Sequence, residues 1–207
     1  MDTAAIRAFA CSPRAGGNTD MMAHHFVQGV RAAGGSAEVT HLRDYTVLPC
    51  TACRCCAEEA NAGCRLDGRD DAAMLFRRIE EASLVCVLAP IFFYHLPAQL
   101  KCLIDRAQRY WERRRLQDAQ GRAPVRPGLV ALVAARTRGE KLFEGSMLTL
   151  TYFFELFDIR AMDGCRLTGY DQPDDLARDE AACARLREMG ARAVALAAEY
   201  PGHPGLP

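Results

Sequence analysis

Apolar residues follow two patterns along this chain. One is a set of short apolar runs, and the other is a set of longer stretches in which apolar residues lie three or four positions apart. The short runs predict β-strands, and the spaced pattern predicts amphipathic helices. Strands are expected at 4–10, 37–42, 83–89, 129–134 and 159–167. Helices are expected at 19–33, from Asp70 onward, at 97–111, at 144–157, and from Asp174 to about Tyr200. The runs at 83–89 and 129–134 are almost continuously apolar, which is typical of central parallel strands covered on both faces.

The alternation of strands and helices predicts a parallel sheet with helices on both faces. Five strands and about five helices suit an α/β, flavodoxin-like three-layer sandwich with strand order 2-1-3-4-5. We expect a single domain over 1–207, with a cysteine-rich loop at 43–69 and an Arg-rich excursion at 112–128. In such sheets a ligand binds beyond the carboxyl ends of the strands, at the switch point between strands 1 and 3. The loops at 11–19, 90–97 and 135–140 should therefore form the site.

The loop at 11–19, called the phosphate loop below, is rich in glycine and hydroxyl side chains and precedes the first helix. Unpaired N–H groups at a helix start attract anions, Ser12 and Thr19 add hydroxyl donors, and Arg14 adds a charged fork. The loop lacks both the Gly-Lys-Ser/Thr ending of a triphosphate site and the Gly-x-Gly-x-x-Gly of a dinucleotide site. It favours a single phosphate monoester; the alternative is an ordinary turn capped by Asn18 or Thr19.

The segment Pro90-Ile-Phe-Phe-Tyr-His95, called the aromatic loop below, places consecutive aromatic residues beyond the third strand. A planar ring system would bury them by stacking, whereas the alternative is that Phe92 and Phe93 pack under a helix. The loop at 135–140 supplies small and hydrogen-bonding groups at the same edge of the sheet. Together the three loops describe a pocket for flavin mononucleotide (FMN).

Three motifs resemble those of one known family: Ser12-Pro-Arg-x-x-Gly-Asn-Thr19, Pro90-Ile-Phe-Phe93 and Gln99-Leu-Lys-x-x-Ile-Asp-Arg106. They look like the NAD(P)H-dependent FMN reductase branch of the flavodoxin-like superfamily. The resemblance implies that the phosphate loop holds the FMN phosphate, and that the other two loops line the isoalloxazine ring. The candidate cofactor-binding residues are Ser12, Arg14, Gly17, Asn18, Thr19, Pro90, Ile91, Phe92, Phe93, Tyr94, Ala135, Arg136 and Thr137. The chain departs from the family pattern at Phe92, where tyrosine is usual, and at Tyr94, where glycine is usual.

Six of the ten cysteines lie outside clearly apolar or helical surroundings. Cys50, Cys53, Cys56 and Cys64 give the spacing C-x2-C-x2-C-x7-C, in which four thiolates can hold a [4Fe–4S] cluster or a zinc ion. The compact triple favours iron, and it resembles the motif of the iron–sulfur flavoproteins. Cys55 is out of register, and the alternative is that these thiols bind no metal. Cys11 is expected to be a small residue tucked beneath the phosphate loop, although a helix start can also make a thiol reactive.

The remaining four cysteines, Cys86, Cys102, Cys165 and Cys183, are expected to be small buried hydrophobic residues. Lys and Arg number 26, as do Asp and Glu, so no net charge steers the chain toward nucleic acid or an anionic membrane. No apolar run is long enough to span a bilayer, and the N-terminal residues show no secretory signal, so a cytoplasmic protein is expected. The Arg-rich stretch from Arg106 to Arg126 is expected to be solvated or intersubunit surface. Contact with the extra phosphate of NADPH or with an acidic partner is the alternative.

These features predict an FMN-dependent oxidoreductase that takes electrons from NAD(P)H and passes them to a small-molecule acceptor or a ferredoxin-like protein. His95 and Tyr94 are the only nearby acid–base candidates, and neither is assigned a catalytic role. The alternatives are a non-enzymatic electron carrier with FMN and an iron–sulfur cluster, and a zinc-stabilised binding module. The resemblance also implies a homodimer or homotetramer.

Overall fold

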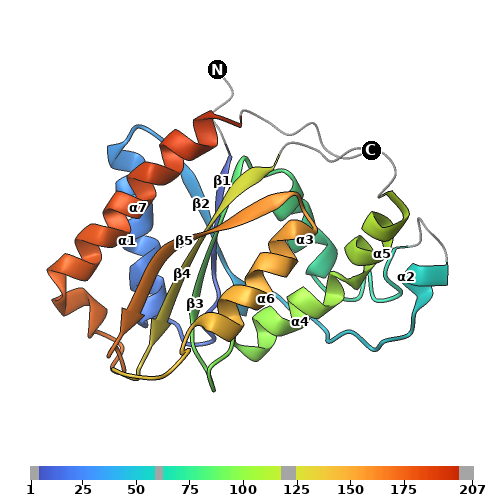
Figure 1. Ribbon diagram of the computed structural model, residues 1–207, viewed down its shortest axis with the longest axis horizontal. Coiled ribbons are helices and arrows are strands. Elements are labelled where there is room, and N and C mark those ends of the chain that lie inside the picture. The colour runs from blue at the N-terminus through green and yellow to red at the C-terminus, as the bar shows by residue number, and fades with distance from the viewer. Residues whose placement is uncertain (1–4, 59–62, 118–124, 201–207) are drawn as a thin grey trace.

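The computed structural model describes residues 5–58, 63–117 and 125–200, and within them it contains one five-stranded parallel sheet (Figure 1). The strand order is β2-β1-β3-β4-β5, so the predicted flavodoxin-like arrangement is confirmed. The strands are β1 (Ile6–Ala10), β2 (Ala37–His41), β3 (Leu84–Pro90), β4 (Arg126–Ala134) and β5 (Ile159–Thr168). Neighbouring strands pair in parallel throughout, which brings their carboxyl ends to one edge of the sheet.

Helices cover both faces of this sheet (Figure 1). On one face lie α1 (Asn18–Ala32) and α7 (Glu180–Ala198). On the other lie α3 (Ala72–Glu80), α4 (Ala98–Arg106), α5 (Gln108–Gln117) and α6 (Glu144–Glu155). Short helical turns complete the described residues: η1 (Leu42–Asp44), α2 (Cys55–Glu58) and η2 (Leu176–Arg178).

Two glycines let α1 and α7 pack backbone against backbone. A Cβ atom on Gly29 would lie 1.9 Å from the Arg187 carbonyl oxygen, and one on Gly190 would lie 2.1 Å from the Phe26 carbonyl oxygen. Only residues without a side chain permit this approach. The close pair of helices fixes where the phosphate loop, which leads into α1, meets the sheet edge.

The fourth strand begins earlier than the apolar pattern predicts, at Arg126 rather than at residue 129. Pro127 therefore lies inside a strand, although proline cannot donate to a strand ladder. Its pairing explains this: Arg126 and Pro127 face only β5, and pairing with β3 starts at Gly128. The proline occupies the part of β4 that has one neighbour, where a missing N–H is tolerated.

Two predicted helices have different bounds in the structure. The helix expected at 97–111 is divided into α4 and α5 at Ala107. The last helix begins at Glu180 rather than Asp174, because the Asp175 carboxylate accepts the N–H groups of Asp171 and Gln172 and shapes a turn there. Asp179 then caps α7 by accepting the N–H of Ala182 at 2.9 Å.

The Arg-rich excursion predicted at 112–128 belongs in part to α5 and in part to β4, and 118–124, with Arg122, lie outside the described residues. The expectation of a solvated surface is wrong for Arg106 and Arg126, which are 2% and 4% exposed. Arg126 donates to the carbonyl oxygens of Ile79 at 3.2 Å and Phe157 at 2.9 Å. The guanidinium there donates to carbonyl oxygens at the carboxyl end of α3 and just after α6. Over the described ranges, no helix combines the length and apolarity needed to cross a membrane.

Candidate functional site

The phosphate loop is shaped by the Ser12 hydroxyl and by glycine. The Ser12 Oγ atom accepts the Arg14 N–H at 3.1 Å and donates to the Arg14 carbonyl oxygen at 3.2 Å. Gly16 has φ of +69°, in the left-handed region, and its N–H donates to the Asp20 carboxylate at 2.7 Å. The Arg14 Nε atom lies 3.1 Å from the point where a Cβ on Gly17 would stand, so the guanidinium lies over Gly17.

The start of α1 presents free N–H groups to the sheet edge. Among the residues the structure describes, no acceptor is found for the N–H groups of Gly17, Asn18 and Thr19. The N–H groups of Asp20 and Met21, by contrast, both bond to the Gly17 carbonyl oxygen. Free donors at a helix start, together with the helix dipole, form an anion site.

The Asn18 side chain bonds to the segment that follows β5. Its Nδ2 group donates to the carbonyl oxygens of Tyr170 at 3.3 Å and Gln172 at 2.8 Å. Its Oδ1 atom accepts the N–H of Leu176 at 3.0 Å. The side chain thus fastens the segment after β5 to the phosphate loop, and its backbone N–H is what remains for a ligand.

Asp20, whose carboxylate accepts the Gly16 N–H, is an ion-paired acidic residue beside the phosphate loop. Arg43 donates to its carboxylate at 2.8 Å, and His41 lies 3.4 Å away. Partial burial raises the pKa of Asp20, but the hydrogen bonds from Arg43 and the Gly16 N–H outweigh that effect, so its pKa lies below the ordinary value. The negative charge of Asp20 is therefore compensated by its own partners beside the phosphate loop.

The aromatic loop makes a tight turn at the end of β3. Phe92 and His95 exchange two backbone hydrogen bonds of 2.9 Å, and Phe93 and Tyr94 between them have φ of +50° and +62°. This is the two-residue turn usually built with Asn-Gly, so two aromatic residues there store backbone strain. Phe92 is 47% exposed and Phe93 fully exposed, which excludes the alternative that both pack under a helix.

Tyr94 turns away from the cleft described next and packs on the loop at 135–140. The Arg136 guanidinium lies over its ring, 5.6 Å from the centroid, and its hydroxyl lies 2.8 Å from where a Cβ on Gly139 would stand. A side chain at 139 would displace the tyrosine hydroxyl from this position. The tyrosine therefore joins two of the three site loops.

A cleft of about 370 Å³ opens where these loops meet, and we call it the flavin cleft. Its lining includes eight of the predicted residues: Ser12, Arg14, Asn18, Thr19, Pro90, Ile91, Phe92 and Ala135. Gly17, Phe93, Tyr94, Arg136 and Thr137 are predicted contacts that do not line it. Val133, Tyr170 and Asp171 line it and were not predicted. The rule that ligands bind beyond the carboxyl ends of strands would have found the last two, because they follow β5.

The residues present fit FMN. One end of the cleft offers free N–H groups, hydroxyls and Arg14 to a phosphate, and the other offers Ile91, Phe92 and Ala135 to an apolar ring. The Tyr170 hydroxyl donates to Asp179 at 2.7 Å, and burial together with this contact raises its pKa to about 12. Tyr170 is therefore a fixed neutral wall of the cleft.

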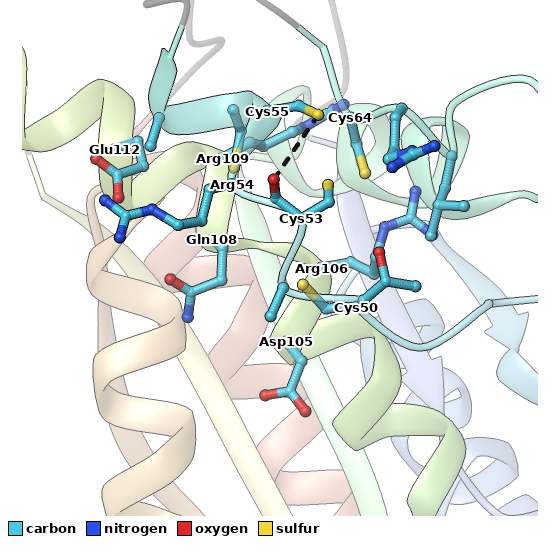
Figure 2. Close-up of a pocket in the computed structure, with 16 residues that line it drawn as sticks. Cys50, Cys53, Arg54, Cys55, Cys64, Asp105, Arg106, Gln108, Arg109 and Glu112 are labelled. Atoms are coloured by element: carbon cyan, nitrogen blue, oxygen red, sulfur yellow. Dashed lines mark hydrogen bonds between the residues drawn. The ribbon is translucent and has the colours of Figure 1, made fainter.

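Five cysteines surround a second cavity of about 330 Å³, the cysteine cavity (Figure 2). Its lining includes Cys50, Cys53, Cys55, Cys56 and Cys64, together with residues of α4 and α5. Ala52 and Arg54 have φ of +51° and +63°, so the loop between the first cysteines is strained. In the described ranges, no three His, Cys, Asp or Glu side chains stand close enough to hold a single metal ion.

The thiols of this cavity differ in their surroundings. The Cys55 thiol donates to the Cys53 carbonyl oxygen at 3.9 Å, which turns it toward its own loop. The backbone N–H of Cys55 lowers the pKa of Cys53, whereas burial raises the pKa of Cys56. Away from the cavity, Cys11 is 2% exposed and burial raises its pKa far above the ordinary value, so the interpretation of Cys11 as a small buried residue is confirmed.

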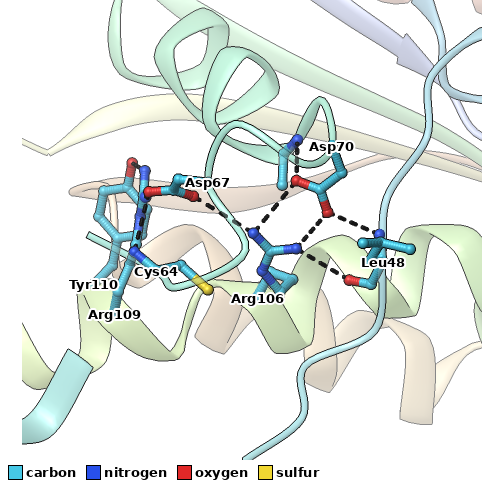
Figure 3. Close-up of polar contacts among 8 residues, drawn as sticks. Leu48, Cys64, Asp67, Asp70, Arg106, Arg109 and Tyr110 are labelled. Atoms are coloured by element: carbon cyan, nitrogen blue, oxygen red, sulfur yellow. Dashed lines mark hydrogen bonds and ion pairs between the residues drawn. The ribbon is translucent and has the colours of Figure 1, made fainter. Parts of the chain in front are cut away.

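A buried ionic network fixes the walls of the cysteine cavity (Figure 3). Arg106 pairs with Asp70, whose side chain is fully buried, and it donates to the Leu48 carbonyl oxygen at 3.2 Å. Asp70 also accepts the Leu48 N–H at 2.9 Å. Asp67 accepts Arg109 at 2.6 Å and the Cys64 N–H at 3.0 Å. The segments that carry Cys50 and Cys64 are thereby tied to α4 and α5.

A flavodoxin-like sheet with an anion site at its switch point defines the class of small α/β domains that bind a phosphate-bearing cofactor. Within that class, residues 4–162 match the sequence model of the NADPH-dependent FMN reductase family, and the chain belongs to this family.

Individual relatives agree with this assignment. An iron–sulfur flavoprotein of Methanocaldococcus jannaschii is 29% identical over 130 residues, which are 63% of this chain and 62% of that protein. A Bacillus subtilis protein assigned as an NAD(P)H-dependent FMN-containing oxidoreductase is 26% identical over 88% of this chain and 94% of its own length. The chain spans between 43% and 62% of the four iron–sulfur flavoproteins that it matches. The structure of an NAD(P)H:quinone oxidoreductase from Methanothermobacter marburgensis has the same fold, with a TM-score of 0.64, 19% identity and coverage of 92% and 96%.

Proposed function

We propose that the chain is an FMN-dependent oxidoreductase whose flavin cleft binds FMN. The observation that carries this proposal is the set of free N–H groups at Gly17, Asn18 and Thr19 beside Arg14, facing an apolar wall. The N–H groups, the hydroxyls of Ser12 and Thr19 and the Arg14 guanidinium would hold the phosphate. Ile91, Phe92 and Ala135 would contact the ring.

When bound, FMN would accept a hydride and could pass its two electrons on one at a time. The chain would bind and orient the flavin and exclude water from it. Tyr94 would hold the loop at 135–140 against the aromatic loop, because it contacts Arg136 and Gly139. Tyr170 would hold one wall without exchanging a proton, because Asp179 occupies its hydroxyl. No side chain of the described cleft is assigned a role as acid or base.

NAD(P)H is the proposed electron donor, in keeping with the family and with the Bacillus subtilis relative. The acceptor is proposed to be a small molecule, since the flavin cleft opens beside a fully exposed Phe93. A purely non-enzymatic carrier would exchange electrons with a protein such as a ferredoxin and would not react with NAD(P)H. Reduction by NADPH therefore separates the two functions.

We further propose that Cys50, Cys53, Cys56 and Cys64 bind a [4Fe–4S] cluster in the cysteine cavity. The four cysteines line one cavity, and two arginines that also line it each have a buried Nε group without a partner within the described residues. The Methanocaldococcus jannaschii relative is named an iron–sulfur flavoprotein. Cys55 is proposed to be a spectator, since its thiol is turned to the Cys53 carbonyl oxygen.

A homodimer is proposed across the outer face of α5 and α6. This face carries Trp111, Leu148 and Tyr152, which are 53%, 60% and 62% exposed. A groove of about 840 Å³ runs between them, with Lys101 and Arg115 on its rim beside Asp105 and Glu155. Mixed charges around an apolar centre suit a second copy of the same surface. Sedimentation should give a dimer for the wild type and a monomer with unchanged circular dichroism for Leu148→Glu; a wild-type monomer would contradict the dimer.

The flavin proposal is tested by titrating flavin-free protein with FMN and following the quenching of flavin fluorescence. One FMN per chain is expected, with weaker binding of riboflavin, which lacks the phosphate. Equal affinity for the two ligands would contradict a phosphate site in the phosphate loop.

The cluster proposal needs anaerobic purification followed by assays of iron and sulfide. About four irons per chain are expected for a [4Fe–4S] cluster. Cys53→Ser should lose the iron, and the neighbouring variant Cys55→Ser should keep it. Iron retained in Cys53→Ser, or lost equally in both variants, would contradict the assignment of ligands.

A further inference from the structure

The buried guanidinium of Arg106 has one donor that the protein leaves unused. The residue is 2% exposed and sits at the end of α4. Its two Nη groups are taken up by Asp70, Asp67 and the Leu48 carbonyl oxygen. Its Nε atom is buried and has no hydrogen-bond partner among the described residues. A buried donor left unpaired destabilises a fold, so a ligand that accepts a hydrogen bond from it would stabilise the site.

Arg109, one turn further along, repeats this arrangement. Its Nη groups donate to Asp67 at 2.6 Å and to the Tyr110 hydroxyl at 3.1 Å. Its Nε atom is also buried without a partner in the described part of the chain. Both arginines line the cysteine cavity, so two residues of its wall each carry one buried N–H donor without a partner among the described residues.

The sulfur atoms lie in reach of this wall. Figure 3 shows the Cys64 sulfur pointing toward Arg106, while the Cys64 N–H is held by Asp67 at 3.0 Å. Figure 2 shows the Cys53 sulfur in the same space. Arg106 is paired with Asp70, and Arg109 is paired with Asp67, so both guanidinium charges are balanced. These ion pairs hold the two side chains in place, and each keeps one unused hydrogen-bond donor. The other charged residues that line the cavity are Arg54, Arg65, Asp105 and Glu112.

We propose that Arg106 and Arg109 are positioning residues that donate their Nε–H groups to the sulfur atoms of the iron–sulfur cluster and so raise its reduction potential. The inference rests on the cluster assigned to this cavity under the proposed function. Hydrogen bonds to the sulfurs and local charge are the main protein controls on the potential of such a cluster. Reduction adds negative charge to the sulfurs, so an N–H donor stabilises the reduced form more than the oxidised form.

Arg-to-Lys variants separate the hydrogen bond from the charge. Lysine at 106 keeps a cation beside Asp70 but has no donor at the Nε position, and the same holds for lysine at 109. Arg77→Lys is the matched control, because Arg77 lies on α3, is exposed, and does not line the cavity. Two variants are used because Arg106 is the more deeply buried, and Arg109→Lys decides the question if Arg106→Lys does not fold.

The measurement is a redox titration of the anaerobically purified protein, followed by electron paramagnetic resonance of the reduced cluster. Arg106→Lys and Arg109→Lys should each retain iron and sulfide but show a lower potential. The expected change is about tenfold in the ratio of reduced to oxidised cluster at a fixed potential, or about 59 mV for one electron. A strongly coupled proton that exchanges in D2O should be lost from the spectrum. Arg77→Lys should match the wild type.

The possible outcomes separate the proposed role of the two arginines from the proposed cluster on which it rests. If the wild type holds a cluster and both lysine variants keep its potential and its coupled proton, the arginine proposal is overturned and the cluster stands. If the variants lose iron without any shift in the potential of the cluster that remains, the arginines only stabilise the fold, and the proposal is again overturned. A wild type without iron and sulfide refutes both.

Discussion

Replacing Arg14 with alanine removes the one cationic side chain that lines the flavin cleft among the described residues. The guanidinium is held over Gly17, with its Nη2 atom 3.5 Å from the Asp171 carbonyl oxygen. It therefore stands next to the free N–H groups that begin α1. A phosphate bound by those N–H groups would lie within direct contact of the guanidinium.

The size of the effect follows from charge and exposure. Two unit charges about 4 Å apart in water attract by about 1 kcal/mol, and a phosphate monoester carries nearly two negative charges at neutral pH. Arg14 is exposed, so the value for water is the appropriate one. The expected loss of about 2 kcal/mol corresponds to a roughly 30-fold weaker affinity for FMN at low salt. Added salt should shrink this difference, because the Debye length falls to about 10 Å at 0.1 M.

The assay compares FMN with riboflavin in wild-type protein, Arg14→Ala and Arg31→Ala. Arg31 lies in the last turn of α1, at the end remote from the phosphate loop, so its removal matches the loss of charge without touching the site. Arg14→Ala should weaken FMN and leave riboflavin unchanged, and Arg31→Ala should leave both unchanged. An equal loss for FMN and riboflavin in Arg14→Ala would refute the phosphate contact.

Three further variants test other parts of the account. Arg126→Ala should lower the free energy of unfolding, measured in urea, by about 3 kcal/mol, because several buried carbonyl oxygens lose their hydrogen-bond donor. A change below about 0.5 kcal/mol would contradict that role. Asp20→Asn should destabilise the protein at neutral pH, because the folded-state pKa of Asp20 lies below its ordinary value of 3.8. That stabilisation is present above pH 3.8 and is lost as the pH falls through the folded pKa, so wild type and variant should converge in acid, and a constant difference would refute the pairing with Arg43. Asn18→Ala should speed hydrogen exchange in 170–176 while leaving α7 protected, and unchanged exchange there would show that Asn18 does not hold that segment.

The sheet and its order were predictable because the strands are short, separate and apolar. The continuous runs of β3 and β4 marked the centre of the sheet, and parallel strands have few ways to connect. The start of β4 was not predictable, because Pro127 is compatible with a strand only where one neighbour is missing. The division at Ala107 was equally hidden, since nothing local to the sequence breaks the helical pattern there.

The site was predictable where it depends on a local motif and hidden where it depends on distant partners. The phosphate loop was recognisable from its glycine and hydroxyl residues, and the cysteine spacing predicted a second site. The Asn18 side chain is engaged by residues more than 150 positions away, which no local pattern reveals. Arg106 looked like surface because its partner Asp70 lies 36 positions earlier in the chain.

The central claim is that this chain passes electrons from NAD(P)H to FMN held in the flavin cleft. The most direct test is an anaerobic titration of the FMN-loaded protein with NADPH, with NADH in parallel, following the visible absorption of the flavin. The account predicts that about one equivalent of NADPH or NADH bleaches the bound flavin, because a hydride carries both electrons. A bound flavin that stays oxidised with both nucleotides, yet is reduced by dithionite, would contradict it.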